Sequence, residues 1–344
     1  MFSYPKLLKD LISKEDDVQV VDALYIAEKQ YAGTYSDMSH SVEKNVIDEL
    51  TNTPWRQVVK DRFFDTNPWL YKIISDPGRA QFLDLLRLPE RGTYLDVGSG
   101  WGQVTIPLAK KGFGVAFDLT RNRLEILRRI AKQEGASVGC LQGNFITFPL
   151  RENIFDLIVF NGSLEWIGSG RDEDETIWDS QFKALNKAAK LLKSDGIVYV
   201  GIENSIGVKY LMGTNDDHTG ISHLMYMSEK EAEKKHFDKH ENKLAAKTWS
   251  LQEYYKLFDE AGLEPIKVYG CFPDYKTIRL MIELEEVNQY FRENEYNISE
   301  YDGSNGEAIG YRIELSQLYS TLALNDNAHY FCPSFGFVLK RKKG

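Results

Sequence analysis

Three alternating glycines stand directly after a short apolar stretch, in the run Tyr94-Leu95-Asp96-Val97-Gly98-Ser99-Gly100-Trp101-Gly102. The apolar residues predict a strand over 93–97, and the residues beyond predict a helix over 102–110. Glycine lets the chain turn sharply and lets a ligand lie against bare backbone. The first turn of a helix also offers N–H groups that have no partner within the helix. The run therefore predicts a ligand-binding turn between a strand and a helix.

Strands and helices continue to alternate after this turn. The run at 155–160 is continuously apolar, as expected of a strand buried on both faces, and residues 178–192 have helical spacing. Further strands are expected at 114–117, 138–141 and 197–202, with a helix at 121–133. Strands separated by helices favour right-handed crossovers and therefore a parallel sheet. The predicted fold class is α/β.

The chain before this region has a different character. Residues 1–90 read as short helices with aromatic residues between them, and residues 18–31 have helical spacing. We expect a helical N-terminal extension that covers the acceptor or forms a homo-oligomer, followed by the main domain over residues 91–343.

Two segments interrupt the main domain and are expected as insertions, at 204–247 and at 282–327. The charged part of the first, residues 229–243, is expected as a solvated helix or a mobile flap. Regular structure resumes where Ser250 and Glu253 form a capping box, and the last strands are expected at 265–269 and 334–340.

The spacing of the glycines indicates which ligand the turn binds. It is Gly-x-Gly-x-Gly and not the Gly-x-Gly-x-x-Gly of dinucleotide-binding turns. Asp96 would sit poorly beside a pyrophosphate but well beside an ammonium group. Asp118 ends the second strand, 20 residues after Gly98, where an acid can accept hydrogen bonds from both ribose hydroxyls. These residues favour an aminoacyl nucleoside over a dinucleotide.

The same residues resemble the class I S-adenosylmethionine-dependent methyltransferases, over about 91–202, 248–280 and the final strand. The resemblance implies a Rossmann-like, mostly parallel seven-stranded sheet whose last strand is antiparallel. It also implies S-adenosylmethionine as the cofactor. The family commonly has an Asp beside the adenine where this chain has Asn144, and the run 161–166 matches the motif near the transferring methyl. The implied cofactor-binding residues are Asp96, Gly98, Ser99, Gly100, Gly102, Asp118, Leu119, Asn144, Phe145 and Asn161.

More narrowly, the chain resembles methyltransferases associated with bacterial surface-polysaccharide biosynthesis. This resemblance rests on the segments 201–210, 217–220, 272–276 and 333–335. It implies that the acceptor is a sugar, a glycan or a related small metabolite.

A hydroxyl acceptor needs a base near the methyl group, and the segment after the fifth strand carries candidates. We expect His218 to be the general base because histidine titrates near working pH, with Asp217 next and Glu165 as a further candidate. Asp217, His218 and Glu165 could also suggest a metal site, but none is predicted. The residues expected to line the acceptor site are Trp166, His223, Tyr275 and Lys276.

The formal net charge of −9 disfavours a nucleic-acid partner because an acidic surface repels phosphates. No apolar run is long enough to cross a bilayer, and the N-terminus lacks a secretory signal, so a cytoplasmic location is expected. Two alternatives stay open. One is a nicotinamide-dependent oxidoreductase on a similar sheet, and the other is a non-catalytic S-adenosylmethionine-binding or scaffold protein.

Overall fold

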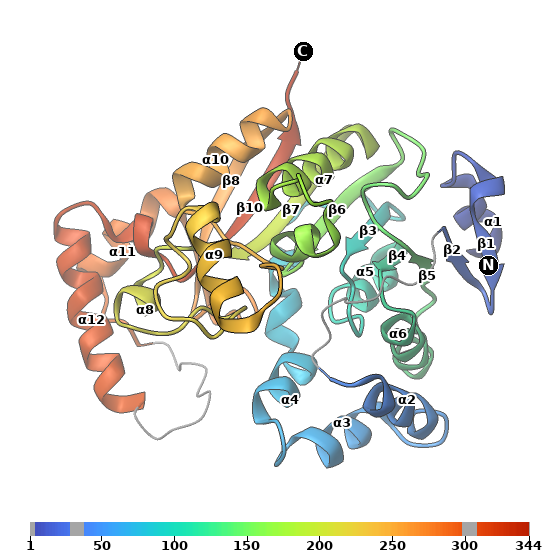
Figure 1. Cartoon of the computed structure of the whole chain (residues 1–344), viewed down its shortest axis with the longest axis horizontal. Coiled ribbons are helices and arrows are strands. Elements are labelled where there is room, and N and C mark those ends of the chain that lie inside the picture. Colours follow the sequence, from blue (N-terminus) through green and yellow to red (C-terminus); the bar gives the residue numbers. More distant parts are fainter. Residues whose placement is uncertain (1–3, 28–37, 298–307, 344) are drawn as a thin grey trace. The chain divides into compact units, whose positions relative to one another are not determined.

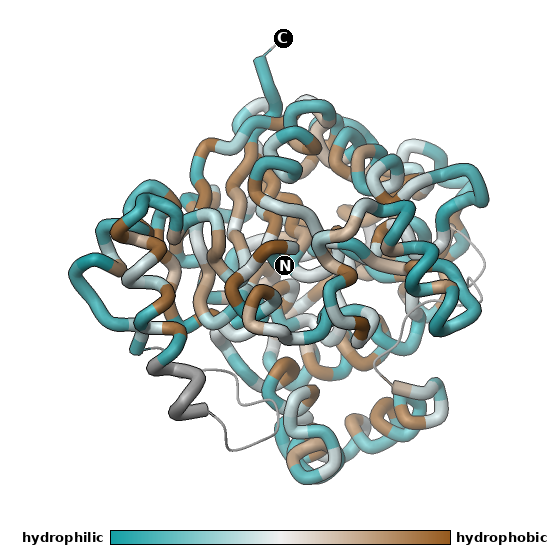
Figure 2. Tube along the Cα trace, turned by 60° about the vertical axis from the view of Figure 1, so that its left-hand side comes forward, coloured by the Kyte–Doolittle hydropathy of each residue, from teal (hydrophilic) through white to brown (hydrophobic). Residues whose placement is uncertain are grey.

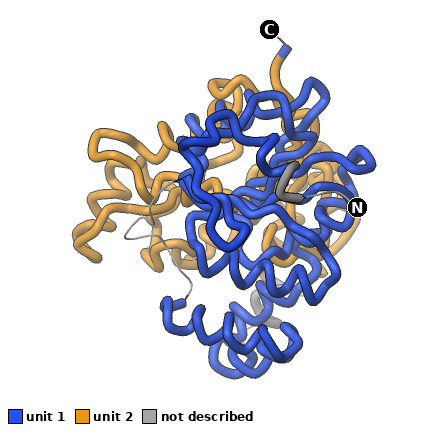
Figure 3. The backbone as a smooth tube through the Cα atoms, turned by 90° about the vertical axis from the view of Figure 1, so that its right-hand side faces the viewer, with its two compact units in different colours: residues 1–161, 183–199, 343–344 blue, residues 162–182, 200–342 orange. Residues whose placement is uncertain are grey.

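The computed structural model describes residues 4–27, 38–297 and 308–343 (Figure 1). The chain divides into two compact units (Figure 3). Unit 1 comprises Met1–Asn161, Lys183–Tyr199 and Lys343–Gly344, and unit 2 comprises Gly162–Phe182 and Val200–Lys342. Strand β7 (Leu192–Glu203) contributes residues to both units.

Unit 1 is built around a parallel sheet. Strand β3 (Thr93–Val97) is parallel to β4 and to β6, and β4 is parallel to β5. These neighbours are β4 (Phe113–Asp118), β5 (Gly139–Gln142) and β6 (Phe155–Asn161). The order β5-β4-β3-β6-β7 is that of a Rossmann-like sheet, in which the chain reverses direction beside its first strand. The expected parallel α/β sheet is therefore confirmed.

The helices of this sheet follow from the apolar spacing of the sequence. Helix α6 (Arg121–Gln133) has the bounds expected, because Leu124, Leu127 and Ile130 are buried on one of its faces. Helix α5 (Thr105–Lys111) begins later than expected. The glycine-rich turn extends as far as Gly102, whose backbone φ of +92° is not helical.

The N-terminal region is only partly helical, which corrects the expectation for residues 18–31. Strands β1 (Gln19–Val21) and β2 (Leu24–Ile26) form an antiparallel hairpin. Its two turn residues, Asp22 and Ala23, both have positive φ, as in tight two-residue hairpin turns. Strand β2 also pairs in parallel with β5 and so extends the sheet. Residues 28–31 of the expected helix lie outside the described residues.

The rest of the N-terminal region is helical, as expected. Its helices are α1 (Tyr4–Asp10), α2 (His40–Glu49), α3 (Trp55–Phe63) and α4 (Pro68–Ser75), with 3-10 turns at Glu15–Asp17 and Pro77–Asp84. Val46, Val58, Val59 and Leu70 form a buried cluster with Ile126 of α6. This packing is within unit 1.

Unit 2 contains the last strands. Strand β10 (Ser334–Arg341) is antiparallel to β8 (Leu263–Phe272), which is antiparallel to β9 (Leu280–Glu283). The expected capping box of Ser250 and Glu253 begins α10 (Leu251–Glu260). The other helices are α8 (Val208–Leu211), α9 (Glu229–His240), α11 (Val287–Glu293) and α12 (Ala308–Leu324), with 3-10 turns at Leu164–Gly170, Leu284–Glu286 and Ala328–Phe331. Helix α7 (Ile177–Leu191) is divided between the units.

The sheet has ten described strands, in the order β1-β2-β5-β4-β3-β6-β7-β10-β8-β9, and not the seven expected. The seven expected strands are the middle ones, from β5 to β8. The three additional strands are the N-terminal hairpin at one edge and β9 at the other. The antiparallel last strand is confirmed by the pairing of β10 with β8.

None of the described helices has the length and apolar character needed to cross a membrane. The outlying turns and loops are mostly hydrophilic (Figure 2). Cys140, Cys271 and Cys332 are all buried and form no disulfide.

Candidate active site

The glycine-rich turn follows β3 in unit 1. Gly98, Gly100 and Gly102 all have positive φ, at 73°, 52° and 92°. The backbone N–H groups of Gly98 and Ser99 both donate to the carbonyl of Phe117 at the end of β4. A Cβ on Gly102 would lie 2.8 Å from Cγ of Leu127, whereas a Cβ on Gly100 would meet nothing nearer than 3.8 Å. Gly102 thus allows close packing on α6, while Gly100 leaves bare backbone for a ligand.

Two buried acids flank this turn. Asp96 is 3% exposed, and its Oδ2 accepts a 2.6 Å hydrogen bond from the hydroxyl of Thr105. Burial outweighs this hydrogen bond and raises the pKa of Asp96 to about 6. Asp118 accepts hydrogen bonds from the N–H groups of Gly100 (3.1 Å) and Thr120 (2.8 Å), and burial raises its pKa as well. Asp118 therefore fixes the turn directly.

Polar atoms at the ends of the strands of unit 1 are buried without a hydrogen-bond partner among the described residues. Among them are Oγ of Ser99, Oε1 of Gln142 and Oδ1 of Asn161. Ser99 and Asn161 were expected as cofactor residues, whereas Gln142 was not. Gln142 ends β5 opposite Asp118, and its amide donates to the carbonyl of Leu119. Buried polar atoms normally have partners, so these atoms fit a ligand rich in hydroxyl and amino groups, such as S-adenosylmethionine.

The other expected cofactor residues have protein partners. Oδ1 of Asn144 accepts a hydrogen bond from the N–H of Ile146, which leaves its amide N–H groups for a ligand. Phe145 is buried and packs edge-to-face against Phe117 and Phe160. Its ring therefore belongs to the core of unit 1.

Arg79 is a second residue that the sequence did not indicate. Its guanidinium donates to the carbonyl of Asn161, and the amide of Asn161 donates to the carbonyl of Arg79. This reciprocal pair holds the end of β6. A single arginine in a 3-10 turn carries no sequence signal of such a contact.

Unit 2 brings together a charged cluster, the acidic–lysine cluster, from four separate segments. Its members are Glu165, Glu203, Lys209, Asp216, Asp217, His218, Tyr275 and Lys276. Five of the expected residues belong to it. The ring of Trp166, a further expected residue, contacts His218 at 5.2 Å between centroids. His223 does not belong to it, because it is exposed and hydrogen-bonded to Tyr226.

Lysines and tyrosine hold the carboxylates of the cluster. Lys276 pairs with Glu203 and lies 3.1 Å from Oδ2 of Asp217, which also accepts a 2.6 Å hydrogen bond from Lys209. The hydroxyl of Tyr275 donates to Oε1 of Glu165 at 3.2 Å. Although burial opposes it, the two lysines lower the pKa of Asp217, and Lys276 and His218 lower that of Glu203.

His218 lies among three carboxylates. Its Nε2 is 3.8 Å from Glu165 and 3.8 Å from Glu203, and its Nδ1 is 3.4 Å from Asp216. Burial opposes a charged imidazole, but Glu203, Asp216 and Glu165 outweigh burial and raise the pKa of His218 to about 10. A histidine that already carries a proton at neutral pH cannot accept another, so this geometry does not favour His218 as a general base.

Glu203 and Asp216 had no predicted role. Glu203 is the last residue of β7 and is fully buried, and Asp216 is 5% exposed. The signal for Glu203 was an acid directly after an apolar strand, at the edge of the sheet where ligands bind.

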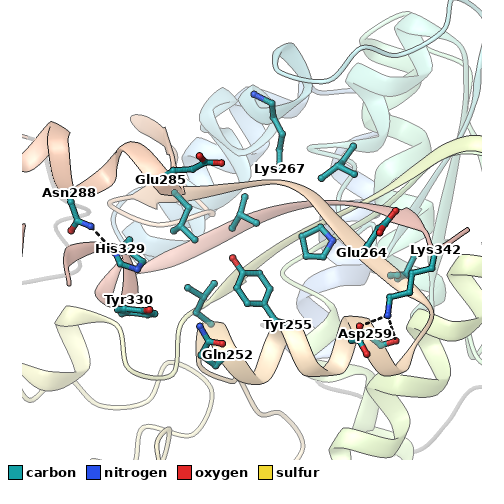
Figure 4. A pocket seen from close by; sticks show the side chains of 16 residues that line it. Gln252, Tyr255, Asp259, Glu264, Lys267, Glu285, Asn288, His329, Tyr330 and Lys342 are labelled. Atoms are coloured by element: carbon teal, nitrogen blue, oxygen red, sulfur yellow. Dashed lines mark hydrogen bonds and ion pairs between the residues drawn. The ribbon is translucent and has the colours of Figure 1, made fainter. Parts of the chain in front are cut away.

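A separate pocket of about 640 Å³ lies between α10, β8 and the segments 284–288 and 329–330 of unit 2 (Figure 4). Tyr255, Lys267 and His329 are among the side chains that line it. None of the residues expected from the sequence lies there, so the pocket gives no support to the expected site.

The glycine-rich turn lies in a region of the chain that is similar to known methyltransferase domains. Residues 95–200 match a family model described as a methyltransferase domain. The ubiquinone/menaquinone biosynthesis C-methyltransferase of Wigglesworthia glossinidia brevipalpis is 30% identical over 104 residues, which are 28% of this chain and 40% of that protein. The tRNA 5-carboxymethoxyuridine methyltransferase of Escherichia coli K12 is 29% identical over 96 residues, which are 26% of this chain and 36% of that protein. The chain thus spans two fifths or less of the length of these relatives.

Among solved structures, the chain is similar to an S-adenosylmethionine-dependent methyltransferase of Thermotoga maritima described as a possible histamine N-methyltransferase. The two share 18% identity with a TM-score of 0.45, over 84% of this chain and 100% of the other. The domain match at residues 95–200 agrees with the methyltransferase class and with the S-adenosylmethionine cofactor expected from the sequence. The names of the two curated relatives refer to a quinone pathway and to tRNA and not to glycans.

Proposed function

We propose that this protein transfers a methyl group from S-adenosylmethionine to a hydroxyl of a sugar, a glycan or a related small metabolite. The observation that carries the proposal is the turn after β3, where bare backbone at Gly100 lies between two buried acids. The match of residues 95–200 to a methyltransferase domain supports the same assignment.

The proposed cofactor contacts follow from the chemistry of the side chains around the turn. The N–H groups of Gly98, Ser99, Gly100 and Gly102 are already bonded within the protein, so the turn would offer bare backbone to the methionine moiety, and the carboxylate of Asp96 suits its ammonium group. Asp118 and the free oxygen of Gln142, which are opposite each other at the ends of β4 and β5, suit the ribose hydroxyls. The amide of Asn144 suits the adenine edge. When bound, the cofactor supplies a methyl group on a sulfonium that is already an excellent leaving group, so the protein mainly aligns the acceptor and excludes water.

The proposed acceptor residues are those of the acidic–lysine cluster. Its carboxylates can accept hydrogen bonds from hydroxyls, and Glu165 follows Asn161, the last residue of β6, by four positions in the chain. Because the raised pKa of His218 disfavours it as a base, the proposed proton-accepting groups are the carboxylates of Glu165 and Glu203, each of which has one oxygen without a hydrogen-bond partner among the described residues. His218 and Lys276 would then position the carboxylates.

The cofactor assignment is tested by calorimetric titration of S-adenosylmethionine into the wild type and two variants, Asp96→Ala and Gly100→Val. We expect affinity to fall at least about tenfold in both, because one loses a charged partner and the other covers bare backbone. Asp84→Ala, at an exposed acid in the same unit, is the control and should bind as the wild type does. Unchanged affinity in both variants would count against the proposal.

The acceptor assignment is tested by following S-adenosylhomocysteine formation with sugar nucleotides, oligosaccharides and tRNA. Turnover with a sugar supports the proposal, and turnover with tRNA alone replaces it by the acceptor class of the Escherichia coli relative. Binding of the cofactor without turnover on any acceptor favours the non-catalytic alternative. A thermal shift with a nicotinamide dinucleotide and none with S-adenosylmethionine would favour the oxidoreductase.

A further inference from the structure

Two carboxylate oxygens in the acidic–lysine cluster are buried without a hydrogen-bond partner among the described residues. They are Oε2 of Glu165 and Oε2 of Glu203, and both residues are 0% exposed. A buried carboxylate oxygen that accepts no hydrogen bond is unfavourable unless a cation or a donor lies beside it. The two oxygens therefore point to a ligand.

The second oxygen of each carboxylate is held by a donor. Tyr275 donates to Oε1 of Glu165, and Lys276 pairs with Oε1 of Glu203. Each carboxylate is thus fixed in orientation through one oxygen, while the other accepts no hydrogen bond from the described residues. Donors that orient a ligating carboxylate in this way are characteristic of the surroundings of metal ions.

His218 completes the arrangement. Its Nε2 lies 3.8 Å from Oε1 of Glu165 and 3.8 Å from Oε2 of Glu203. Its other ring nitrogen, Nδ1, faces the carboxylate of Asp216 at 3.4 Å. Histidines that bind metals usually direct their second ring nitrogen at a carboxylate, which fixes the ring. The Asp216–His218 pair has this form.

We propose that Glu165, Glu203 and His218 together bind one divalent cation. Each residue offers one ligand atom, and these atoms lie within 4.8 Å of one another. Two ligand atoms that are each about 2.1 Å from one ion are separated by about 3.0 to 4.2 Å. The 3.8 Å between Nε2 and the unpartnered Oε2 of Glu203 falls in this interval, and so does the 3.8 Å between Nε2 and Oε1 of Glu165, the oxygen that Tyr275 also contacts. Only small side-chain movements are needed to close the site.

The charges of the cluster fit a divalent ion. It contains four carboxylates, Glu165, Glu203, Asp216 and Asp217, and two lysines, Lys209 and Lys276. With His218 neutral as a ligand, two negative charges remain, and a divalent cation offsets both. The proton on Nε2 of His218 and a metal ion would compete for the same position beside the carboxylates of Glu165 and Glu203.

Two carboxylates and one imidazole suit Mn²⁺ and similar hard divalent ions. Three protein ligands leave further coordination positions open, and a hydroxyl of the acceptor could occupy one of them. Only that last role rests on the proposed methyl transfer, because binding of the ion needs neither cofactor nor acceptor.

The test is a titration of Mn²⁺ into the full chain without cofactor, in which electron paramagnetic resonance measures the concentration of the free ion. We expect one site in the wild type. In Glu203→Gln, and in Asp216→Asn, which removes the carboxylate beside His218, affinity should fall about 10- to 100-fold. Glu264→Gln, at an exposed glutamate of β8, is the matched control and should bind as the wild type does.

Circular dichroism establishes that each variant is folded, and a crystal soaked in Mn²⁺ supplies a measurement that needs no variant. An anomalous peak between Glu165, Glu203 and His218 supports the proposal. No binding by the wild type at millimolar Mn²⁺, or equal affinity in all four proteins, overturns it. The cluster would then be an ion-pair network closed by the proton on His218, and the cofactor assignment would be unaffected.

Discussion

The glycine-rich turn of unit 1 and the acidic–lysine cluster of unit 2 both bury acids, but with opposite effects on their protonation. Burial raises the pKa of Asp96 to about 6, because the Thr105 hydroxyl and the charge of Arg79 offset burial only in part. Burial acts in the same direction on Glu203, yet Lys276 and His218 lower its pKa below the ordinary value. Nearby cations, and not depth, decide whether a buried acid is charged.

The two regions also differ in how the chain assembles them. The turn takes its acids from consecutive strands, with Asp96 in β3 and Asp118 in β4. The cluster joins residues that are up to 111 positions apart, from Glu165 to Lys276. We therefore expect the stability of unit 2 to depend on the charge pairs of the cluster, and the turn to act mainly on the ligand.

The largest expected effect is that of Lys276→Met. The methionine retains the length of the side chain but leaves Glu203 buried without its cation, which should lower the free energy of unfolding by about 3 to 5 kcal/mol. Urea unfolding at pH 7 measures the change. Lys256→Met removes an exposed lysine that is paired with Glu260 and should change stability little. Equal effects of the two variants would show that the cluster contributes no more than a surface ion pair.

The second prediction makes the same substitution in both regions. A Cβ on Gly162, whose φ is +78°, would lie 2.4 Å from the hydroxyl of Tyr275. Gly162→Ala should therefore lower the free energy of unfolding by about 2 to 3 kcal/mol, from backbone strain and overpacking together. Gly100→Ala has a similar φ of +52° but open space around it, so its stability loss should be smaller. Urea unfolding ranks the two, and the reverse order would contradict this account of the turn.

The turn comes from neighbouring residues and the cluster from distant segments, and this difference decides how much of each could be predicted from the sequence. The strand and the turn after it were predicted, because Gly98, Gly100 and Gly102 alternate in the chain and each signals a backbone requirement of its own. The roles of these residues and of Asp96 toward a cofactor stay predictions. Gln142 was missed, since a glutamine at a strand end has no pattern. Its significance appears only from its unpartnered oxygen opposite Asp118.

The cluster was predicted only as separate candidates. Glu165, Asp217, His218 and Lys276 were named, but no sequence pattern places them beside Glu203. The raised pKa of His218 follows from that long-range assembly, and no spacing along the chain encodes it. The hairpin before residue 27 was missed for a local reason, because short apolar runs fit a helix or a strand equally well.

The third prediction concerns Asp96→Asn, which should stabilise the protein and lower its affinity for the cofactor. A carboxyl whose pKa is about 6 in the folded protein and 3.8 ordinarily binds its proton more tightly when folded. Ionised Asp96 therefore opposes folding above pH 6, and this penalty disappears as pH falls toward 3.8. The uncharged amide should raise the free energy of unfolding at pH 8 by about 1 to 2 kcal/mol.

Urea unfolding at pH 8 and pH 4.5 checks the sign, because the gain from Asp96→Asn should be larger at the higher pH. Calorimetry should show weaker binding of S-adenosylmethionine by the same variant. Asp84→Asn, at an exposed acid, is the control for both measurements. If Asp96→Asn instead lowers stability at pH 8, the charge on Asp96 is already offset by a nearby cation, as the carboxylates of the cluster are offset by lysines.

The smallest expected effect tests whether Tyr275 orients the carboxylate of Glu165 for the cation or only stabilises the fold. Tyr275→Phe removes the hydrogen bond to Glu165, and Tyr319→Phe removes one of 3.0 Å to the carbonyl of Phe331 in the same unit. Each should lower the free energy of unfolding by about 1 kcal/mol. Only Tyr275 orients a proposed ligand of the cation, so only Tyr275→Phe should also weaken Mn²⁺ binding, by about tenfold. If both variants bind Mn²⁺ as the wild type does, Tyr275 does not orient Glu165 for the cation and contributes to packing alone.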